Sequence, residues 1–236
     1  MADPIQQVKD AMMRDMHQLD VISQNIANVN TPGYRALQPI ATPFNDLVTD
    51  PAHSRAQSLT LPTLVKNAPG NLVKTGRALD VGIQGQGFLQ LQAGSQIYLT
   101  RAGSLQLNAE GLLVGANGYP VVGQSGNIQL KGSDVRIESS GAIYEDGQLI
   151  DHLALVAVAD PQALRHLGTG VYAYHPQDFT PVDSPNLQQG HVESSNVNSS
   201  ESMIQLIQLQ RHIESTQKAL QAYGQIMNAG VNELGK

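Results

Sequence analysis

The sequence predicts an α+β fold in which N- and C-terminal helices pair as a coiled coil, with an inserted all-β domain of short strands and hairpins. Three observations lead to this prediction. A helical apolar stripe runs up to residue 29, a heptad-like seam follows residue 193, and short apolar runs separated by turn residues lie between them. The period of the apolar residues therefore changes twice along the chain.

The first helix is predicted over residues 4–29, where apolar residues recur at steps of three and four. They form one stripe: Ile5, Val8, Met12, Met16, Leu19, Ile22, Ile26 and Val29. The stripe ends before Pro32 and Gly33, because proline disfavours helix at the preceding residue and glycine accepts the turn that follows. Residues 1–35 are therefore predicted to be the N-terminal helix and its turn.

The middle of the chain divides into a linker and a β domain. Residues 36–74 are predicted to be an extended linker with room for a short strand or helix, since prolines cluster there and no steady period is present. Residues 75–192 are predicted to be all-β, with residues 152–160 as one buried strand. The turn signals of this domain are Glu110-Gly111, Asn117-Gly118, Ser125-Gly126, Ser140-Gly141 and Asp146-Gly147.

The second helix is predicted over residues 199–232, within a C-terminal segment 193–236. Asn198 is the predicted N-cap, and Glu201 follows as in a capping box. The seam residues step by three and four in alternation: Leu206, Leu209, Ile213, Thr216, Leu220, Tyr223 and Met227. Two arrangements stay open, an ordinary hairpin packed on the β domain or helices ordered only in a larger assembly. The weakly charged outer faces favour assembly.

The composition argues against several classes of protein. The chain has no cysteine, and therefore no disulfide and no thiolate nucleophile. Its net charge is −6, only 14% of its residues are charged, and it has no basic run, which argues against nucleic-acid binding. No apolar run approaches the ~20 residues of a membrane span. The first residues lack the apolar core of a cleaved signal peptide, so we expect any export to use another route.

No catalytic, cofactor or metal site is expected. Residues 82–87 have a G-x-x-G-x-G spacing, but a strand is predicted after them, so a tight turn is favoured over a phosphate loop. The histidines lack zinc-ligand spacing, and Glu145, Asp146 and Asp151 do not follow a calcium-loop pattern. The sequence therefore predicts that the protein is not an enzyme.

Four segments, in order, resemble the motifs of the bacterial flagellar rod and hook family. They are LDVISQNIANVNTPGYRA (19–36), ALDVGIQGQGFLQL (78–91), YLTRAGSLQLNAEGLLVGANGYPVVG (98–123) and GHVESSNVNSSESMIQLIQLQRHIE (190–214). The family-motif residues are Asn25, Ala27, Asn28, Thr31, Gly33, Tyr34, Leu79, Asp80, Gly85, Gly87, Phe88, Arg101, Gly103, Gly118, Ser195, Asn196 and Val197. The first residues of the chain, and Leu105 where the family often has Phe, depart from the pattern.

The resemblance implies a structural subunit of the flagellar basal-body rod that polymerises helically through its terminal helices and transmits torque from motor to hook. It implies copies of the chain, other rod proteins and the flagellar export apparatus as partners, and a place in the periplasm. The expected assembly interface is Val8, Met12, Leu19, Ile22, Asn25, Ile26, Asn28, Val29, Asn196, Leu206, Leu209, Ile213, Leu220, Tyr223 and Met227. Asn25, Asn28 and Asn30 are expected to contact neighbouring subunits, to cap the turn, or both.

The short chain and the compact 36–74 segment favour the proximal-rod type over the distal-rod or hook type. Two other classes stay open. A cell-wall-active enzyme would need paired acids in a cleft, and a soluble adaptor or chaperone would hold a partner with its helical ends.

Overall fold

A computed structural model describes residues 4–39, 63–132, 134–168, 170–174 and 179–234, and confirms an α+β fold. The chain divides into two compact units. The helical unit comprises Met1–Ile26, Pro39–Thr63 and Asn198–Lys236, and the β unit comprises Ala27–Gln38 and Leu64–Val197. The turn after the first helix and residues 193–197 therefore belong to the β unit, whereas the sequence grouped them with the terminal helices.

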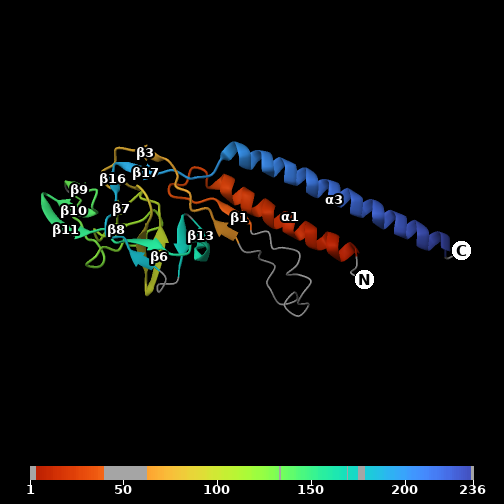
Figure 1. The fold of residues 1–236 in the computed structure, drawn as a ribbon, viewed down its shortest axis with the longest axis horizontal. Helices are drawn as coiled ribbons and strands as arrows, with labels where there is room; N and C mark the ends of the chain where they lie inside the picture. Colours follow the sequence, from red (N-terminus) through yellow and green to blue (C-terminus); the bar gives the residue numbers. More distant parts are fainter. Residues whose placement is uncertain (1–3, 40–62, 133, 169, 175–178, 235–236) are drawn as a thin grey trace. The chain divides into compact units, whose positions relative to one another are not determined.

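The helical unit contains α1 (Pro4–Ala27) and α3 (Ser199–Leu234), which run side by side in opposite directions (Figure 1). The ends of both helices lie within two residues of the predicted ones. The chain leaves α1 in a turn, in which the Thr31 amide donates to the Asn28 carbonyl oxygen at 3.1 Å.

The start of α3 is capped as predicted by Asn198. Its Oδ1 accepts the backbone N–H of Glu201 at 3.2 Å, and its carbonyl oxygen accepts that of Ser202 at 2.9 Å. The Glu201 carboxylate accepts a hydrogen bond from the Gln205 amide at 3.4 Å, one turn further along the helix. The cap satisfies N–H groups that have no partner inside the helix.

The β unit is built from short strands. They are β1 (Leu37–Pro39), β2 (Thr63–Val65), β3 (Leu72–Lys74), β4 (Val81–Ile83), β5 (Phe88–Ala93), β6 (Gln96–Thr100), β7 (Gln106–Leu107), β8 (Leu113–Val114), β9 (Val135–Ile137), β10 (Ala142–Glu145), β11 (Gln148–His152), β12 (Leu155–Val158), β13 (Arg165–Gly168), β14 (Val171–Ala173), β15 (Phe179–Pro181), β16 (Leu187–Gln189) and β17 (His191–Glu193), with a short helix η2 (Pro161–Ala163). The segment between β1 and β2 lies outside the described residues, so the structure leaves most of the predicted linker undescribed.

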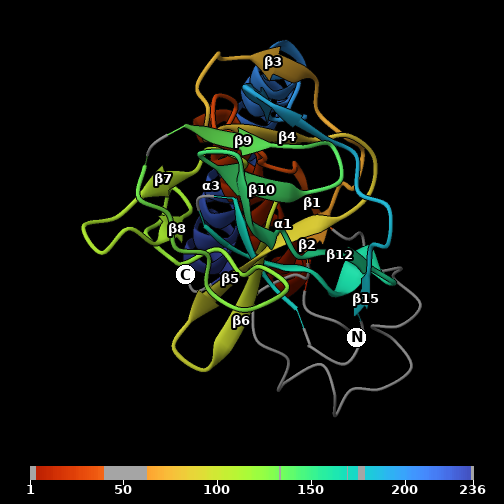
Figure 2. The ribbon, with the colours of Figure 1, turned by 90° about the vertical axis from the view of Figure 1, so that its left-hand side faces the viewer.

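The largest sheet has the antiparallel order β13-β14-β6-β5-β12-β15, and β11-β10-β9 form a second sheet. Figure 2 shows the β5–β6 hairpin and, apart from it, the β9–β10 pair. Strands β16 and β17 pair with β4 and β3, so that Leu187 lies opposite Ile83 and Glu193 opposite Leu72. These two pairs join the last part of the β unit to its first.

The five predicted turn dipeptides all lie in turns or bends. At Asp146-Gly147, between β10 and β11, both residues have positive φ, 51° and 79°, as in a type I′ hairpin. Residues 152–160 do not form one strand as predicted. His152 ends β11, Leu153 bridges to Gly123, and β12 begins at Leu155, because the chain passes there from one sheet to another.

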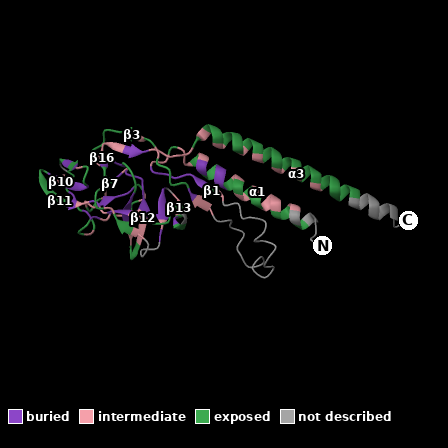
Figure 3. Cartoon of the chain, viewed as in Figure 1, coloured by how far each residue is buried: buried purple, intermediate pink, exposed green. Residues whose placement is uncertain are grey.

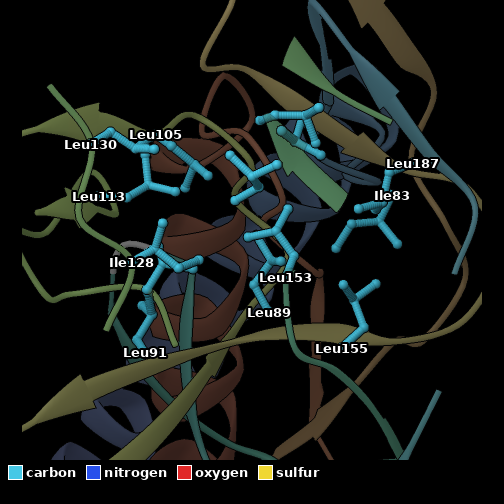
Figure 4. Close-up of a cluster of buried hydrophobic side chains, with 14 of the residues drawn as sticks. Ile83, Leu89, Leu91, Leu105, Leu113, Ile128, Leu130, Leu153, Leu155 and Leu187 are labelled. Atoms are coloured by element: carbon cyan, nitrogen blue, oxygen red, sulfur yellow. The ribbon is translucent and has the colours of Figure 1, made fainter. Parts of the chain in front are cut away.

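The core of the β unit is one aliphatic cluster shared by several sheets (Figure 4). Strands β4, β5, β8, β12 and β16 contribute Ile83, Leu89, Leu91, Leu113, Leu155 and Leu187. The connecting segments add Leu105, Ile128, Leu130 and Leu153. Because each sheet is small, this common cluster is what holds the short strands together.

Candidate functional site

The predicted seam of α3 is half-buried, while most of its remaining described surface is exposed (Figure 3). The half-buried seam residues are Leu206, Leu209, Ile213, Thr216 and Leu220. Tyr223 is exposed, and the side chain of Met227 lies outside the described residues. Over residues 199–226, where side chains are described, none is fully buried. The helix therefore keeps apolar surface in contact with water.

The face of α1 near α3 follows the predicted stripe with one difference. Val8, Met12, Leu19 and Ile26 are half-buried and Ile22 is buried. Met16 is 53% exposed, whereas the nearby Met13 and His17, which are not in the predicted stripe, are half-buried. The side chain of Ile5 lies outside the described residues.

Two contacts bring α1 and α3 together. Val8 lines a groove of about 380 Å³ with α3 residues that include Ala219, Leu220 and Tyr223. Asp15 Oδ2 lies 3.5 Å from His212 Nε2. The helices thus lie antiparallel along these positions, and the groove shows that their side chains leave space between them.

A second apolar surface lies near the start of α3. Met203, Ile204 and Ile207 are 50%, 57% and 51% exposed. Three large apolar side chains within two turns of one helix are more than the scattered single ones that a monomer surface normally carries. We call these three residues the outer patch.

The asparagines after α1 take part in the turn. Asn28 Oδ1 accepts the Thr31 hydroxyl at 3.1 Å, which is the capping role. Asn25 is buried, Val29 is half-buried and Asn30 is exposed. Contacts of these residues with neighbouring subunits stay a prediction.

A buried charge cluster holds several of the family motifs together within the β unit. Glu193 Oε1 lies 3.0 Å from Arg35 Nη2, and its Oε2 lies 2.6 Å from Arg101 Nη2. All three side chains are at most 2% exposed. Glu193 Oε1 also accepts the Gly70 amide at 2.8 Å, and the Glu193 carbonyl oxygen accepts the Gly33 amide at 2.7 Å. Glu193 in β17 therefore contacts three other segments of the β unit. We call Arg35, Arg101 and Glu193 the junction.

Arg101 connects the junction to the glycine-rich turn. Its Nη1 donates to the carbonyl oxygens of Gly85 at 2.9 Å and Gly87 at 2.6 Å, and its Nη2 donates to that of Ile83 at 3.1 Å. Its guanidinium carbon lies 5.8 Å from the centre of the Phe88 ring. Carbonyl oxygens at the turn before β5 thus accept hydrogen bonds from a buried arginine, which agrees with the predicted tight turn.

Arg35 connects the junction to the segment before β3. Its Nη1 donates to the carbonyl oxygens of Asn67, at 3.0 Å, and Ala68. Its Nε is buried and has no hydrogen-bond partner among the described residues. Desolvation lowers the pKa of Arg35. The carboxylate of Glu193 acts to raise this pKa, and the positive charge of Arg101 acts to lower it further.

Asn196 adds amide contacts beside the junction. Its Oδ1 accepts the Ala36 amide at 2.6 Å, and its Nδ2 donates to the carbonyl oxygens of Lys66 and Ala68 at 2.9 and 2.6 Å. The backbone amide of Asn196 donates to the Tyr34 carbonyl oxygen at 3.3 Å. The structure thus places Asn196, an expected assembly residue, in contacts inside the β unit.

An aromatic group lies next to the junction. The His166 ring stands edge-on to the Tyr34 ring, and their centroids lie 5.1 Å apart. The centroids of the His166 and Tyr172 rings lie 5.4 Å apart. The Tyr172 hydroxyl accepts the Arg35 amide at 2.9 Å. Burial raises the pKa of Tyr34, and it raises that of Tyr172 to about 12 against the opposing backbone hydrogen bond from Arg35.

Two motif glycines permit close backbone approach. A Cβ at Gly33, whose φ is +67°, would lie 2.3 Å from the carbonyl carbon of Arg101 and from the amide of Ala102. A Cβ at Gly103 would lie 1.7 Å from the Val81 carbonyl oxygen. Both positions therefore require glycine.

The other motif residues serve local contacts. Asp80 is fully buried and accepts hydrogen bonds from Arg77 at 2.9 and 2.6 Å and from Thr75 at 2.5 Å. Leu79 packs against the core, and Ser195 Oγ accepts the Val197 amide at 3.3 Å. Gly118 has a φ of +80° in its turn, and Ala27 ends α1.

Two of the carboxylates that were compared with a calcium loop, Glu145 and Asp151, accept hydrogen bonds from backbone amides. Glu145 Oε1 accepts the amides of Lys131 and Gly132 at 2.7 and 2.9 Å. The Asp151 carboxylate accepts the amides of Ser125 and His152, at 2.7 Å for the shortest contact. These carboxylates fix turns. The described residues contain no group of potential metal ligands and no helix suited to crossing a membrane.

Sequence reasoning missed Arg35, Glu193 and Tyr172. Arg35 and Glu193 stand inside the quoted motif segments, and in a chain with only 14% charged residues a charged residue within such a segment was a usable signal. Tyr172 lies between the motif segments and carried no comparable signal. Its contact with Arg35 spans 137 positions.

Long helices with uncovered apolar side chains, together with a β unit whose buried charges serve internal contacts, define a structural assembly protein. Three family models match the chain: "Flagella basal body rod protein" at residues 9–35, "Flagellar hook protein FlgE/F/G D1 domain" at residues 82–145, and "Flagellar basal body rod FlgEFG protein C-terminal" at residues 188–234. The chain belongs to the flagellar basal-body rod protein family.

Relatives of both rod types are similar along most of the chain. The rod protein FlgG of Agrobacterium fabrum is 32% identical, covering 86% of this chain and 88% of its own length. FlgG of Buchnera aphidicola subsp. Acyrthosiphon pisum is 30% identical, covering 89% and 91%. The rod protein FlgF of Mesorhizobium japonicum is 28% identical, covering 100% and 99%.

Proposed function

We propose that this chain is a structural subunit of the bacterial flagellar basal-body rod, and that it polymerises helically through α1 and α3 to transmit torque from motor to hook. The observation that carries the proposal is the α3 surface, where the seam is only half-buried and the outer patch is exposed. Relatives named as rod proteins support the same class. A helical array of one interface does not close on itself and so builds a rod.

We further propose that the seams of α1 and α3 pair as a coiled coil when neighbouring copies cover them. The alternating steps of three and four in the seam support this pairing, and so do the antiparallel contacts of Val8 and Asp15 with α3. In this arrangement residues 1–35 and 193–236 supply the rod core, residues 36–74 link it to the β domain, and residues 75–192 lie outside it.

The proximal-rod type is the favoured place for the subunit. FlgF of Mesorhizobium japonicum matches the full length of this chain, which supports this choice, although FlgG relatives are slightly more identical. The partners are then copies of the chain, other rod proteins and the export apparatus. The location is the periplasmic part of the basal body. The subunit has no catalytic role.

Substitutions in the seam test the proposal. Leu209→Asp and Ile26→Asp each place a charge at a half-buried apolar position and are expected to abolish incorporation and swimming while leaving the β unit folded. Light scattering measures self-association of the purified chain. Gln217→Asp, on the exposed side of α3, is the matched control and should assemble normally. Normal swimming of the Leu209→Asp strain would contradict the proposal.

A further inference from the structure

His166 is half-buried, and the surroundings of its Nε2 favour the neutral form of the imidazole. Its imidazole lies between the rings of Tyr34 and Tyr172. Its Nε2 is buried and has no hydrogen-bond partner among the described residues. A protonated imidazole carries a donor on both ring nitrogens, so protonation would leave a buried N–H without an acceptor.

The two aromatic groups that face the imidazole carry no charge that would favour its protonation. Tyr34 from the N-terminal turn and Tyr172 from β14 face the imidazole, and burial keeps both phenols neutral. The charges of Arg35, Glu193 and Arg101 act on the Tyr172 hydroxyl, and these two cations have one carboxylate between them. On β13 itself Arg165 is exposed.

We propose that His166 makes the attachment of residues 31–36 to the rest of the β unit sensitive to acid, with the attachment closed while His166 is neutral and loosened when it is protonated. The attachment consists of the Tyr34 ring against His166, the Arg35 amide on the Tyr172 hydroxyl, and the Gly33 amide on the Glu193 carbonyl oxygen. Separation of Tyr34 from His166 would open the imidazole to water and let it take a proton.

The sign of the effect follows from linkage. Burial lowers the pKa of His166 below 6.5. The opened state therefore binds a proton more tightly than the closed state. The stability of the attachment is fully present above the ordinary histidine pKa and is lost as the pH falls below about 6.5. The proposal does not depend on rod assembly, because every residue in it belongs to the β unit of one chain.

Amide hydrogen exchange of the full-length chain tests the proposal. Protection of the Gly33 and Arg35 amides, corrected for intrinsic exchange, is expected to fall up to about tenfold per pH unit below pH 6.5. In His166→Phe, which keeps an aromatic ring in place, their protection should not depend on pH. His152→Phe is the matched control and should behave as the unsubstituted chain. An unchanged pH dependence in His166→Phe would overturn the proposal.

A second measurement needs no substitution. The imidazole of His166, followed by NMR in the full chain, should titrate below the ordinary histidine pKa of about 6.5, and its titration should coincide with the loss of Gly33 and Arg35 protection. An ordinary midpoint, or protection that stays constant while His166 titrates, would also overturn the proposal.

Discussion

The sharpest prediction concerns Glu193→Gln in the junction. The substitution keeps the shape of the side chain but removes the single carboxylate shared by Arg35 and Arg101, all three being at most 2% exposed. It also replaces one carboxylate oxygen with an N–H₂ group. In the unsubstituted chain that oxygen accepts a hydrogen bond from either Arg101 or the Gly70 amide. Two buried guanidinium groups are then left without a counter-charge.

The expected cost follows from that burial. Removing one partner of a buried ion pair destabilises a protein by about 3–5 kcal/mol. For a unit of this size that corresponds to a fall of about 6–20 °C in the midpoint of thermal unfolding. Far-ultraviolet circular dichroism, at wavelengths sensitive to β structure, or calorimetry of the full chain measures this fall in the midpoint.

Glu138→Gln is the matched control for this experiment. Its carboxylate lies 2.9 Å from Arg136, but these side chains are 37% and 71% exposed, so the pair should contribute less than about 1 kcal/mol. If Glu193→Gln unfolds at the same temperature as Glu138→Gln, the junction does not hold the β unit together and the reasoning is wrong.

Three further substitutions probe other parts of the fold. Gly33→Ala should destabilise the β unit by more than about 2 kcal/mol, because its Cβ would overlap the backbone of Arg101 at a φ of +67°; urea unfolding measures the loss, and a neutral effect would count against it. Asn198→Ala removes the cap of α3 and should cost about 1 kcal/mol, seen as reduced helicity, whereas equal helicity would show that the cap is dispensable. Tyr172 has its pKa raised to about 12, so the folded state holds the phenolic proton more tightly and stability should fall as the pH rises from 10 to 12. Phenolate absorbance and unfolding against pH measure this fall, and Tyr172→Phe should show a smaller one; an identical fall would remove Tyr172 as its cause.

The repetitive parts of the fold were predictable from the sequence. The α3 seam recurs every three or four residues, and the half-buried positions from Leu206 to Leu220 follow that spacing. The Asp146-Gly147 turn and the Asn198 cap were also predictable, because each depends on neighbouring residues only. Local patterns were sufficient for these elements.

The junction and the sheet order were not predictable in this way. Glu193 meets Arg101 across 92 positions, and no periodic pattern marks a contact between distant residues. The passage of the chain from one sheet to another at Leu153 likewise depends on where Gly123 and Gly141 lie. Such features follow from the packing of the whole unit, and one sequence does not encode them in any short stretch.

The pairing of β16 and β17 with β4 and β3 has a consequence for how the chain is made. A ribosome delivers residues 72–83 long before residues 187–193, so the early strands wait for their partners during synthesis. Closing a loop of that length is slow compared with forming a local hairpin. The β unit thus stays incomplete, with Arg35 and Arg101 uncompensated, until Glu193 has emerged.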